Sequence, residues 1–283
     1  FGSIFIEQIS QFLAYDIDIM VSSIEKLLLI DAHAQHYHKK ARVHLKIDTG
    51  ASRLGILQKD ALNFVRALKK YKQLELEGLW SHFASSESDP NYTKTQYNIL
   101  RSVDENLSQN GFNIPIKHIA CSAATMNTKF THENAVRVGF SLYGLYPNNK
   151  RSIKLKSALS WYTTVIQTKD LPTGTKVSYG GTFTTTRPTK IAVLAVGYWD
   201  GYDRRLSNNG YVLIKNKFCK ILGRVCMNIC MVDVTGLHVK AGDRAVLIGQ
   251  NGKQSISVDD LARWTKGFNY ELVARINPTL PRV

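Results

Sequence analysis

Residues 43–48, Val-His-Leu-Lys-Ile-Asp, open the alternation of elements that decides the fold of the first half of this chain. Their apolar side chains indicate a buried strand, and Asp60 then caps a helix whose apolar residues recur at helical spacing up to Tyr71. The pattern repeats, with strands predicted over residues 76–82, 116–121 and 135–139 and a helix that ends at Gly111. Strands that recur with helices between them imply a parallel sheet or barrel.

Near Leu155 the residue pattern changes from strands that alternate with helices to mostly strands. Residues 159–165 alternate between apolar and polar side chains, which predicts a strand with one buried face. Further apolar segments predict strands over residues 191–196 and 211–214. We therefore expect an α/β chain with a barrel-type domain over residues 1–154 and a mostly β domain over residues 155–283.

Two local signals support the second domain. Asn251-Gly252 lies between two apolar segments, which predicts a β-hairpin. Ser257 and Asp260 have the spacing of a capping box, which predicts a short helix that begins there and runs to Lys266.

Composition limits the classes of function. The chain has no apolar run of about 18 residues and no basic leader segment, so we expect neither a membrane span nor a signal peptide. Its four cysteines lack the spacing of a zinc site, which favours reduced thiols in the cytoplasm. The net charge of +15 would suit an anionic partner, but no nucleic-acid-binding motif accompanies the scattered lysines, so we expect no nucleic acid. These lysines include Lys69, Lys70 and Lys72 on a predicted helix and Lys215, Lys217 and Lys220 in a strand region.

Polar side chains follow the predicted strands of the first half, where barrel enzymes place their chemistry. They are Lys46, Arg53, His82, Ser122 and Arg137. Ser122 lies at a strand-to-helix turn, where its hydroxyl and backbone N–H groups could receive a phosphate. Each residue also has an ordinary alternative: a solvated charge, a surface ion pair or a hydrogen-bonded core histidine.

Two tyrosines of the second half lie at turn-rich points between apolar strands. Tyr179 stands in Val-Ser-Tyr-Gly-Gly-Thr, and Tyr198 stands in Gly-Tyr-Trp-Asp-Gly-Tyr. A phenol has an ordinary pKa of about 10 and can be tuned to act as a general acid or base. Whether Tyr179 does so depends on the groups around it.

Seven motifs occur in an order that resembles the alanine racemases, the fold-type III pyridoxal phosphate enzymes. They are Lys-x-Asp-Thr-Gly-x-x-Arg-Leu-Gly (46–55), Ser-His-Phe-Ala (81–84), Cys-Ser-Ala-Ala (121–124), Val-Arg-x-Gly-x-x-Leu-Tyr-Gly-Leu (136–145), Val-Ser-Tyr-Gly (177–180), Gly-Tyr-x-Asp-Gly-Tyr (197–202) and Gly-Arg-Val-Cys-Met (223–227). The resemblance implies a (β/α)8 TIM-type barrel, incomplete in this chain, followed by a mostly β C-terminal domain. It implies interconversion of L- and D-alanine for peptidoglycan precursors, with pyridoxal 5′-phosphate as cofactor, in a homodimer with shared active sites.

The resemblance also implies a role for each site residue. Tyr179 matches the tyrosine that moves a proton on one face of the substrate Cα across the dimer interface, and His82 matches the histidine coupled to it. Arg137 matches the arginine that faces the pyridine nitrogen, and His118 matches its supporting partner. The remaining positions match cofactor phosphate contacts (Ser122, Gly139, Phe140 and Tyr270), the arginine near the cofactor oxygen and substrate carboxylate (Arg53), a carbamylated lysine (Lys46), an entry-gate tyrosine (Tyr198) and a backbone donor to the substrate (Met227).

The main departure from the family is the lysine that holds the cofactor as a Schiff base. Its Val-x-Lys-Ala-Asn-Ala-Tyr-Gly-like motif is absent, and the first lysine of the chain is Lys26. We therefore expect that lysine, which serves the second face of Cα, to lie outside this chain. Three alternatives stay open: a truncated, non-catalytic cofactor-binding or interaction protein, a broader racemase for serine or lysine, and a basic anion-binding module.

Overall fold

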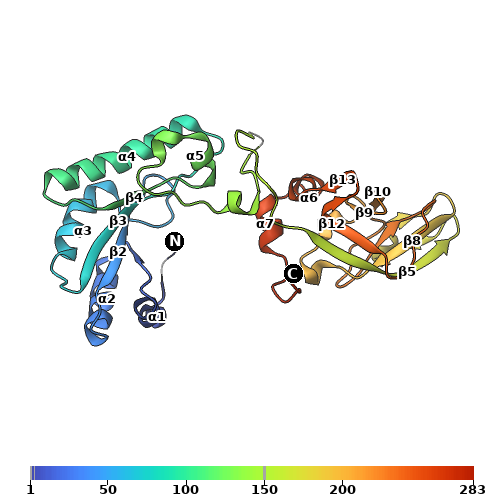
Figure 1. The fold of residues 1–283 in the computed structure, drawn as a ribbon, viewed down its shortest axis with the longest axis horizontal. Helices are drawn as coiled ribbons and strands as arrows, with labels where there is room; N and C mark the ends of the chain where they lie inside the picture. The colour runs from blue at the N-terminus through green and yellow to red at the C-terminus, as the bar shows by residue number, and fades with distance from the viewer. Residues whose placement is uncertain (1, 3, 149–150) are drawn as a thin grey trace. The chain divides into compact units, whose positions relative to one another are not determined.

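The computed structural model describes residues 2, 4–148 and 151–283, and the chain divides into two compact units (Figure 1). The first unit comprises Phe1–Leu142 and Tyr146–Lys154, and the second comprises Tyr143–Leu145 and Leu155–Val283. In the described part of the chain, no helix has both the length and the apolar character needed to cross a membrane.

The first unit is built from strands that alternate with helices. Its elements are α1 (Ile9–Ala14), β1 (Ile19–Val21), α2 (Ile24–His36), β2 (Ala41–Lys46), α3 (Ala61–Leu68), β3 (Leu74–Trp80), α4 (Pro90–Gln109), β4 (Ile116–His118) and α5 (Ser122–Asn127). The four strands pair in parallel in the order β1-β2-β3-β4, with one crossover helix between each pair. This order is the winding of a TIM-type barrel, and it confirms the predicted α/β fold class.

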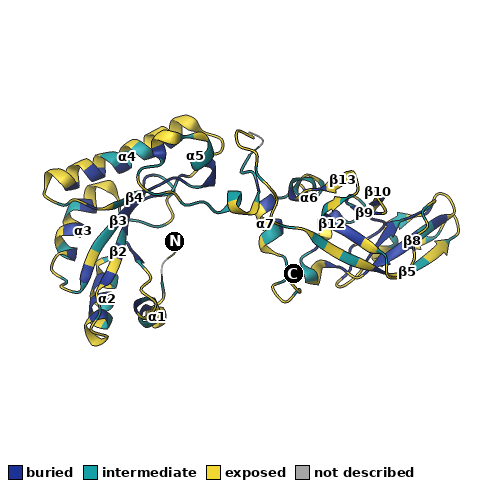
Figure 2. Ribbon diagram, viewed as in Figure 1, coloured by how far each residue is buried: buried dark blue, intermediate teal, exposed yellow. Residues whose placement is uncertain are grey.

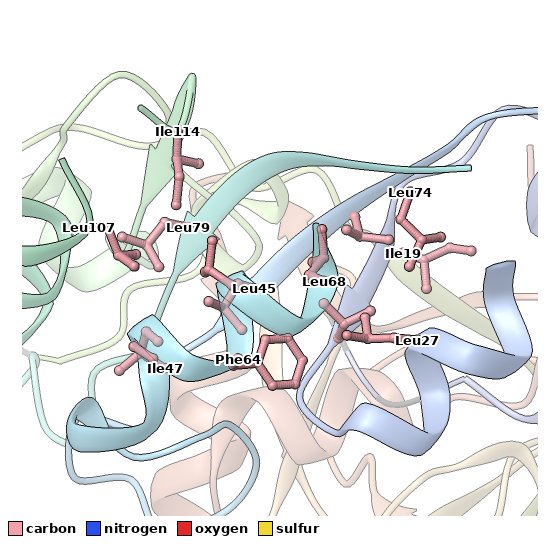
Figure 3. Close-up of a cluster of buried hydrophobic side chains, with 14 of the residues drawn as sticks. Ile19, Leu27, Leu45, Ile47, Phe64, Leu68, Leu74, Leu79, Leu107 and Ile114 are labelled. Atoms are coloured by element: carbon pink, nitrogen blue, oxygen red, sulfur yellow. The ribbon is translucent and has the colours of Figure 1, made fainter. Parts of the chain in front are cut away.

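One face of this sheet carries the hydrophobic core. Successive side chains of a strand point to opposite faces, so Leu45 of β2 and Leu79 of β3 share the covered face. Figure 3 shows them beside Leu27 of α2 and Phe64 of α3. The helices therefore bury one side of the sheet and leave polar side chains on the other side.

The opposite face carries a polar row that the strand register sets. Lys46 of β2 lies opposite Trp80 of β3, and Trp80 lies opposite His118 of β4. His44 precedes Lys46 by two residues and so belongs to the same face, opposite Gly78. This is the side of the sheet that lines the interior of a closed barrel.

The second unit is mostly β. Its elements are β5 (Trp161–Leu171), β6 (Lys176–Val177), β7 (Phe183–Thr184), β8 (Thr189–Leu194), β9 (Tyr211–Ile214), β10 (Lys217–Lys220), β11 (Cys230–Asp233), β12 (Arg244–Asn251), β13 (Gln254–Ile256), α6 (Val258–Thr265) and α7 (Asn269–Ala274). The large sheet has the antiparallel order β10-β9-β12-β5-β8-β11, and β13 also pairs with β12. β5 alternates between half-buried and exposed residues up to Val165, as predicted, whereas β8 and β12 contain continuous buried runs (Figure 2).

Short 3-10 helices complete both units. They are η1 (Ile6–Gln8), η2 (Gln58–Asp60), η3 (Lys129–Thr131), η4 (Phe140–Tyr143), η5 (Tyr179–Gly181), η6 (Tyr198–Asp200) and η7 (Arg204–Leu206). Several of these follow strand ends and carry residues of the sequence motifs.

The two local signals of the second domain are confirmed. β12 and β13 form the predicted hairpin, although the loop between the paired residues Asn251 and Gln254 is Gly252-Lys253, one residue later than expected. Ser257 and Asp260 form a reciprocal capping box at the start of α6.

Two predicted elements are wrong. Residues 135–139 form no strand, because pairing with β4 is limited to one bridge at Ala135, and the N–H of Gly139 bonds to the Ser122 hydroxyl instead. The helix expected up to Tyr71 ends at Leu68, so the basic residues from Lys69 onward lie in a turn. In that turn the N–H of Tyr71 donates to the carbonyl of Leu68, three residues earlier.

Candidate active site

Arg137 occupies the centre of the polar face of the first unit. Its Nη1 donates to Nδ1 of His118 at 2.6 Å, and its Nη2 donates to Nδ1 of His82 at 3.0 Å. Nη2 also donates to the carbonyls of Ser81 and Ile119, at 2.7 and 3.2 Å. A planar guanidinium held by four acceptors has one orientation, so the position of Arg137 is set by the ends of β3 and β4.

Arg137 is charged at pH 7, whereas the two histidines beside it are neutral. Burial, and then the charge of Arg137, lower the pKa of His82 to about 4 and the pKa of His118 to about 3. Burial also lowers the pKa of Arg137 to about 10, which still leaves the guanidinium protonated at pH 7. Both imidazoles are therefore neutral at pH 7, and each offers Nδ1 as an acceptor to a cation.

Trp80 provides the surface on which these groups lie. Its ring stacks on His118, with centroids 5.5 Å apart and planes inclined by 17°. The Cζ of Arg137 lies 4.7 Å from the centroid of the Trp80 ring, and Nζ of Lys46 lies 4.3 Å from it. Cations over an indole face are stabilised by its quadrupole, which helps to hold two positive groups in one place.

Lys46 is buried to 3% exposure at the end of β2. Burial, and then the charges of Arg53 and Arg137, lower the pKa of its amine. A lysine in this setting is more readily neutral than a surface lysine and is therefore a better nucleophile.

Arg53 is exposed on the loop that follows β2. Asp48 shapes this loop by accepting the N–H groups of Gly50 and Ser52, at 2.9 and 3.1 Å. Gly55 has a φ of +123°, and a Cβ there would lie 2.6 Å from the backbone nitrogen of Asp48. The loop therefore turns back onto its own strand and keeps Arg53 close enough for its charge to lower the pKa of Lys46 and His82.

The backbone at His82 is hydrogen-bonded to Gln96 of α4. The fully buried Gln96 donates to the carbonyl of His82 at 3.3 Å and accepts the N–H of Ala84 at 2.9 Å. Its amide also donates to Thr49, whose hydroxyl bonds with that of Ser81 at 2.7 Å. This buried network sets the backbone from which His82 projects.

Ser122 begins α5 and joins two of the sequence motifs. Its Oγ accepts the N–H groups of Gly139 and Ser141, at 2.9 and 3.4 Å. Phe140 lies between these donors as the first residue of η4. These bonds gather the serine hydroxyl and two N–H groups at the start of α5, and a phosphate bound there would replace the serine oxygen as their acceptor.

Tyr179 lies in the second unit and is 72% exposed. The residue before it, Ser178, has a φ of +66°, and its hydroxyl donates to the carbonyl of Arg224 at 2.7 Å. A Cβ at Gly223 would lie 2.6 Å from both the Cβ of Ser178 and the carbonyl oxygen of Val177. The tyrosine is therefore presented to solvent by a backbone that is itself tightly held.

Tyr198 and Met227 lie on loops that pack against each other. The N–H of Tyr198 donates to the carbonyl of Cys226, and that of Trp199 donates to the carbonyl of Met227, both at 2.9 Å. Gly197 permits this approach, because a Cβ there would lie 2.2 Å from both carbonyl oxygens. The second unit thus brings together the motifs that contain Tyr179, Tyr198 and Met227.

Tyr270 lies on α7 of the second unit and is partly exposed. Its ring meets that of Phe268 edge to face, with centroids 6.2 Å apart. The C-terminal end of α7 leads to Asn277, whose N–H donates to the carbonyl of Asp200 at 3.1 Å. The helix is therefore tied to the turn that carries Tyr198.

The sequence analysis missed four residues of the first unit that touch this centre: Asp18, His44, Trp80 and Ser141. The alternation of β2 could have indicated His44, since it stands two residues before Lys46 on the same face. Asp18 precedes β1 and has no such signal, because only the packing of β1 beside β2 brings it to His44.

Two family models match the chain. The model of the alanine racemase N-terminal domain matches residues 1–147, and that of the alanine racemase C-terminal domain matches residues 158–283. Together they include every motif on which the resemblance was based, and they confirm it.

Individual proteins agree with the family models. The chain is 39% identical to the alanine racemase of Methanococcus maripaludis, in an alignment that covers 100% of this chain and 77% of that protein. It superposes on the alanine racemase of Clostridium difficile 630 with a TM-score of 0.91 and 32% identity, covering 98% of this chain and 73% of that one. It superposes on the Bacillus anthracis alanine racemase solved with bound L-Ala-P with a TM-score of 0.90 and 32% identity, covering 98% and 72%. The chain belongs to the alanine racemase family.

Proposed function

We propose that this protein is a pyridoxal-phosphate-dependent alanine racemase that interconverts L- and D-alanine for peptidoglycan precursors. The observation that carries the proposal is the setting of Arg137, a cation held by two neutral histidines and two carbonyls. A group with such restricted geometry suits a reaction in which one orientation of a cofactor matters. Family membership supplies the reaction class.

The donor groups of the first unit fit the cofactor. The N–H groups of Gly139 and Ser141 meet at the Ser122 hydroxyl, and a phosphate bound there would accept from them in place of the serine oxygen. We assign the phosphate to Ser122, Gly139 and Phe140, and the pyridine nitrogen to Arg137; the resemblance alone supports Tyr270 as a further phosphate contact. When bound, pyridoxal phosphate supplies an electron-withdrawing ring that acidifies the Cα–H bond of the amino acid.

Arg137 has a definite chemical consequence in this position. An arginine remains protonated at pH 7, so it donates a hydrogen bond to a ring nitrogen without transferring a proton. A ring nitrogen that stays unprotonated withdraws electrons less strongly, which disfavours reactions that need charge spread far into the ring. The residue therefore favours simple removal and return of one proton.

Tyr179 is the group we assign to proton transfer on one face of the substrate. His82 supports it: because Nδ1 accepts from Arg137, the neutral imidazole carries its proton on Nε2 and can donate that proton to a phenolate. A binding protein without chemistry has no need of such a coupled set, so the non-catalytic alternative is not favoured.

We assign substrate recognition to Arg53, Tyr198 and Met227. Arg53 offers a planar cation for the carboxylate of alanine. We assign Lys46 to the positioning of Arg53, whose charge already lowers the pKa of the Lys46 amine after burial does so. Tyr198 and Met227 lie together on exposed loops of the second unit. Tyr179, 72% exposed, also lacks cover in its own unit, which suits a homodimer in which each protomer completes its partner's site. The four free cysteines suit action in the cytoplasm.

The experiment is an assay of D-alanine formed from L-alanine. We would purify the chain, and the same reading frame with its upstream codons, and add pyridoxal phosphate to each. In the active form, Tyr179→Phe should lower kcat about 10²- to 10⁴-fold, the range for loss of a positioned acid or base. Tyr162→Phe is the matched control, since Tyr162 lies on β5 against Arg244. Absence of D-alanine from both forms, or an undiminished Tyr179→Phe variant, would contradict the proposal.

A further inference from the structure

The hydrogen bonds of Arg137 continue beyond His118 to residues for which the family resemblance implied no role. Nε2 of His118 lies 2.9 Å from Nδ1 of His44. Nε2 of His44 lies 3.1 Å from Oδ2 of Asp18. All four side chains line one cavity of about 550 Å³ on the polar face of the sheet.

The two ends of this chain of four residues define its direction. A guanidinium only donates, so Nδ1 of His118 accepts, and the proton of the neutral ring is on Nε2. A carboxylate only accepts, so the proton of His44 is on its own Nε2 and Nδ1 is left to accept from His118. Each hydrogen bond therefore runs from Arg137 toward Asp18, and no other neutral arrangement satisfies both ends.

The backbone makes room for this arrangement. A Cβ at Gly78 would lie 2.0 Å from Nδ1 of His44, so glycine is required beneath the ring. Asp18 is itself held, because Nε of Arg42 bonds to its other carboxylate oxygen at 2.6 Å. The His44 ring is thus confined between β3 and a fixed carboxylate.

We propose that Asp18 and His44 are positioning residues that hold His118 in its Nε2–H tautomer and so fix the orientation of Arg137. The proposal rests on the proposed function, in which Arg137 meets the ring nitrogen of the cofactor. A carboxylate behind an imidazole orients the ring and strengthens its far nitrogen as an acceptor, as it does behind metal-bound histidines. Through two imidazoles, Asp18 would strengthen the bond that His118 makes to Arg137.

The first test measures tautomers without cofactor. Long-range ¹H–¹⁵N spectra of the chain labelled at histidine should show the Nε2–H tautomer for both His44 and His118. Asp18→Ala should give a mixture of tautomers at His44, and Gly78→Ala should do the same by displacing its ring. Asp16→Asn, which removes a nearby carboxylate that pairs with Lys39 at the surface, should match the wild-type spectrum. An Nδ1–H tautomer at His118 in the wild type, or an unchanged spectrum in Asp18→Ala, would overturn the proposal.

The second test measures recognition of the ring nitrogen. We would compare the Kd of pyridoxal phosphate with that of its analogue that has a carbon in place of this nitrogen. Wild type should prefer the natural compound, and Asp18→Ala should reduce that preference about tenfold, while Asp18→Asn, which keeps an accepting oxygen, restores part of it. Preference unchanged in Asp18→Ala overturns the positioning role. If wild type binds both compounds with the same Kd, the placement of Arg137 at the ring nitrogen in the proposed function is wrong. The tautomer spectra then still test the hydrogen bonds among Asp18, His44 and His118.

Discussion

Nη2 of Arg137 lies 3.0 Å from Nδ1 of His82, so a permanent cation donates to the very imidazole that we assign to support Tyr179. Burial first, and then the charge of Arg137, lower the pKa of His82 and keep its ring neutral at pH 7. The hydrogen bond also joins His82, the proposed support of Tyr179, directly to Arg137, the proposed cofactor contact.

Replacement of Arg137 by lysine should lower both activity and stability, although the charge is kept. A lysine ammonium cannot reach the four acceptors that the planar guanidinium meets, and each buried acceptor left unpaired costs about 1–3 kcal/mol. We expect kcat/KM to fall by about 100-fold or more, and urea unfolding to show a loss of a few kcal/mol. Arg187→Lys, at an exposed ion pair with Asp233, should change neither quantity appreciably. Equal effects of the two substitutions would contradict the role of geometry.

Stability should fall as the pH is lowered from about 6.5 to 4. The pKa values of His82 and His118 are lowered to about 4 and about 3, whereas unfolded histidines titrate near 6.5, so the unfolded chain binds more protons across this range. The free energy of unfolding should decrease by an amount on the order of 1–3 kcal/mol for each histidine. Urea unfolding at several pH values measures it. His118→Gln should flatten the curve, and His36→Gln, at an exposed helix end, should leave it unchanged.

Lys46 should react with carbon dioxide to form a carbamate. Burial and the charges of Arg53 and Arg137 lower the pKa of its amine, which increases the neutral, nucleophilic fraction. The same two cations would stabilise the negative carbamate that results. After addition of ¹³C-bicarbonate, the ¹³C spectrum should show a carbamate signal that disappears in Lys46→Gln and persists in Lys39→Gln, whose lysine pairs with Asp16 at the surface. A signal that survives in Lys46→Gln would assign the reaction to another amine.

Gly197→Ala should separate the loop of Tyr198 from that of Met227. A Cβ there would lie 2.2 Å from two backbone carbonyl oxygens, and backbone cannot move as cheaply as the end of a side chain. We expect a loss of about 1–3 kcal/mol in stability, the usual cost of overpacking, and a raised KM for alanine. Gly236→Ala is the control: nothing lies within 4 Å of the added atom, so only its left-handed backbone, with φ of +76°, costs about 1 kcal/mol. A Gly197→Ala variant that keeps the wild-type KM would contradict the coupling of these loops.

Much of the fold could be predicted because its signals are local. The period-2 alternation near β5, the turn residues between β12 and β13 and the capping box of Ser257 all act over a few residues. The segment 135–139 was wrongly predicted to be a strand, because an apolar pattern does not show whether a neighbouring strand is available for pairing. There the hydroxyl of Ser122, far away in sequence, takes the N–H that a strand ladder would have used.

The candidate site, like the fold, was predictable where its signals are local and not where they depend on long-range contacts. Order and spacing of motifs were enough to select Arg137, His82 and Tyr179, because they match the motifs of a known family. Of these three, only His82 lies just beyond a parallel strand of the first unit, β3, and Tyr179 belongs to the second unit. Asp18 was not selected, because its contact with His44 depends on the register of β1 beside β2. A single carboxylate before a three-residue strand has no pattern of its own.

The sequence by itself therefore determined the class of fold, the family and the residue types of the site, because these depend on periodicity and on side-chain chemistry. Only the tertiary structure decided which nitrogen of each histidine accepts and which donates. For His118 and His44 that choice is made by Arg137 at one end and Asp18 at the other, residues far apart in the sequence that the parallel sheet brings to one row of hydrogen bonds. A hydrogen bond has a direction only when both of its ends are in place, and only folding puts them there.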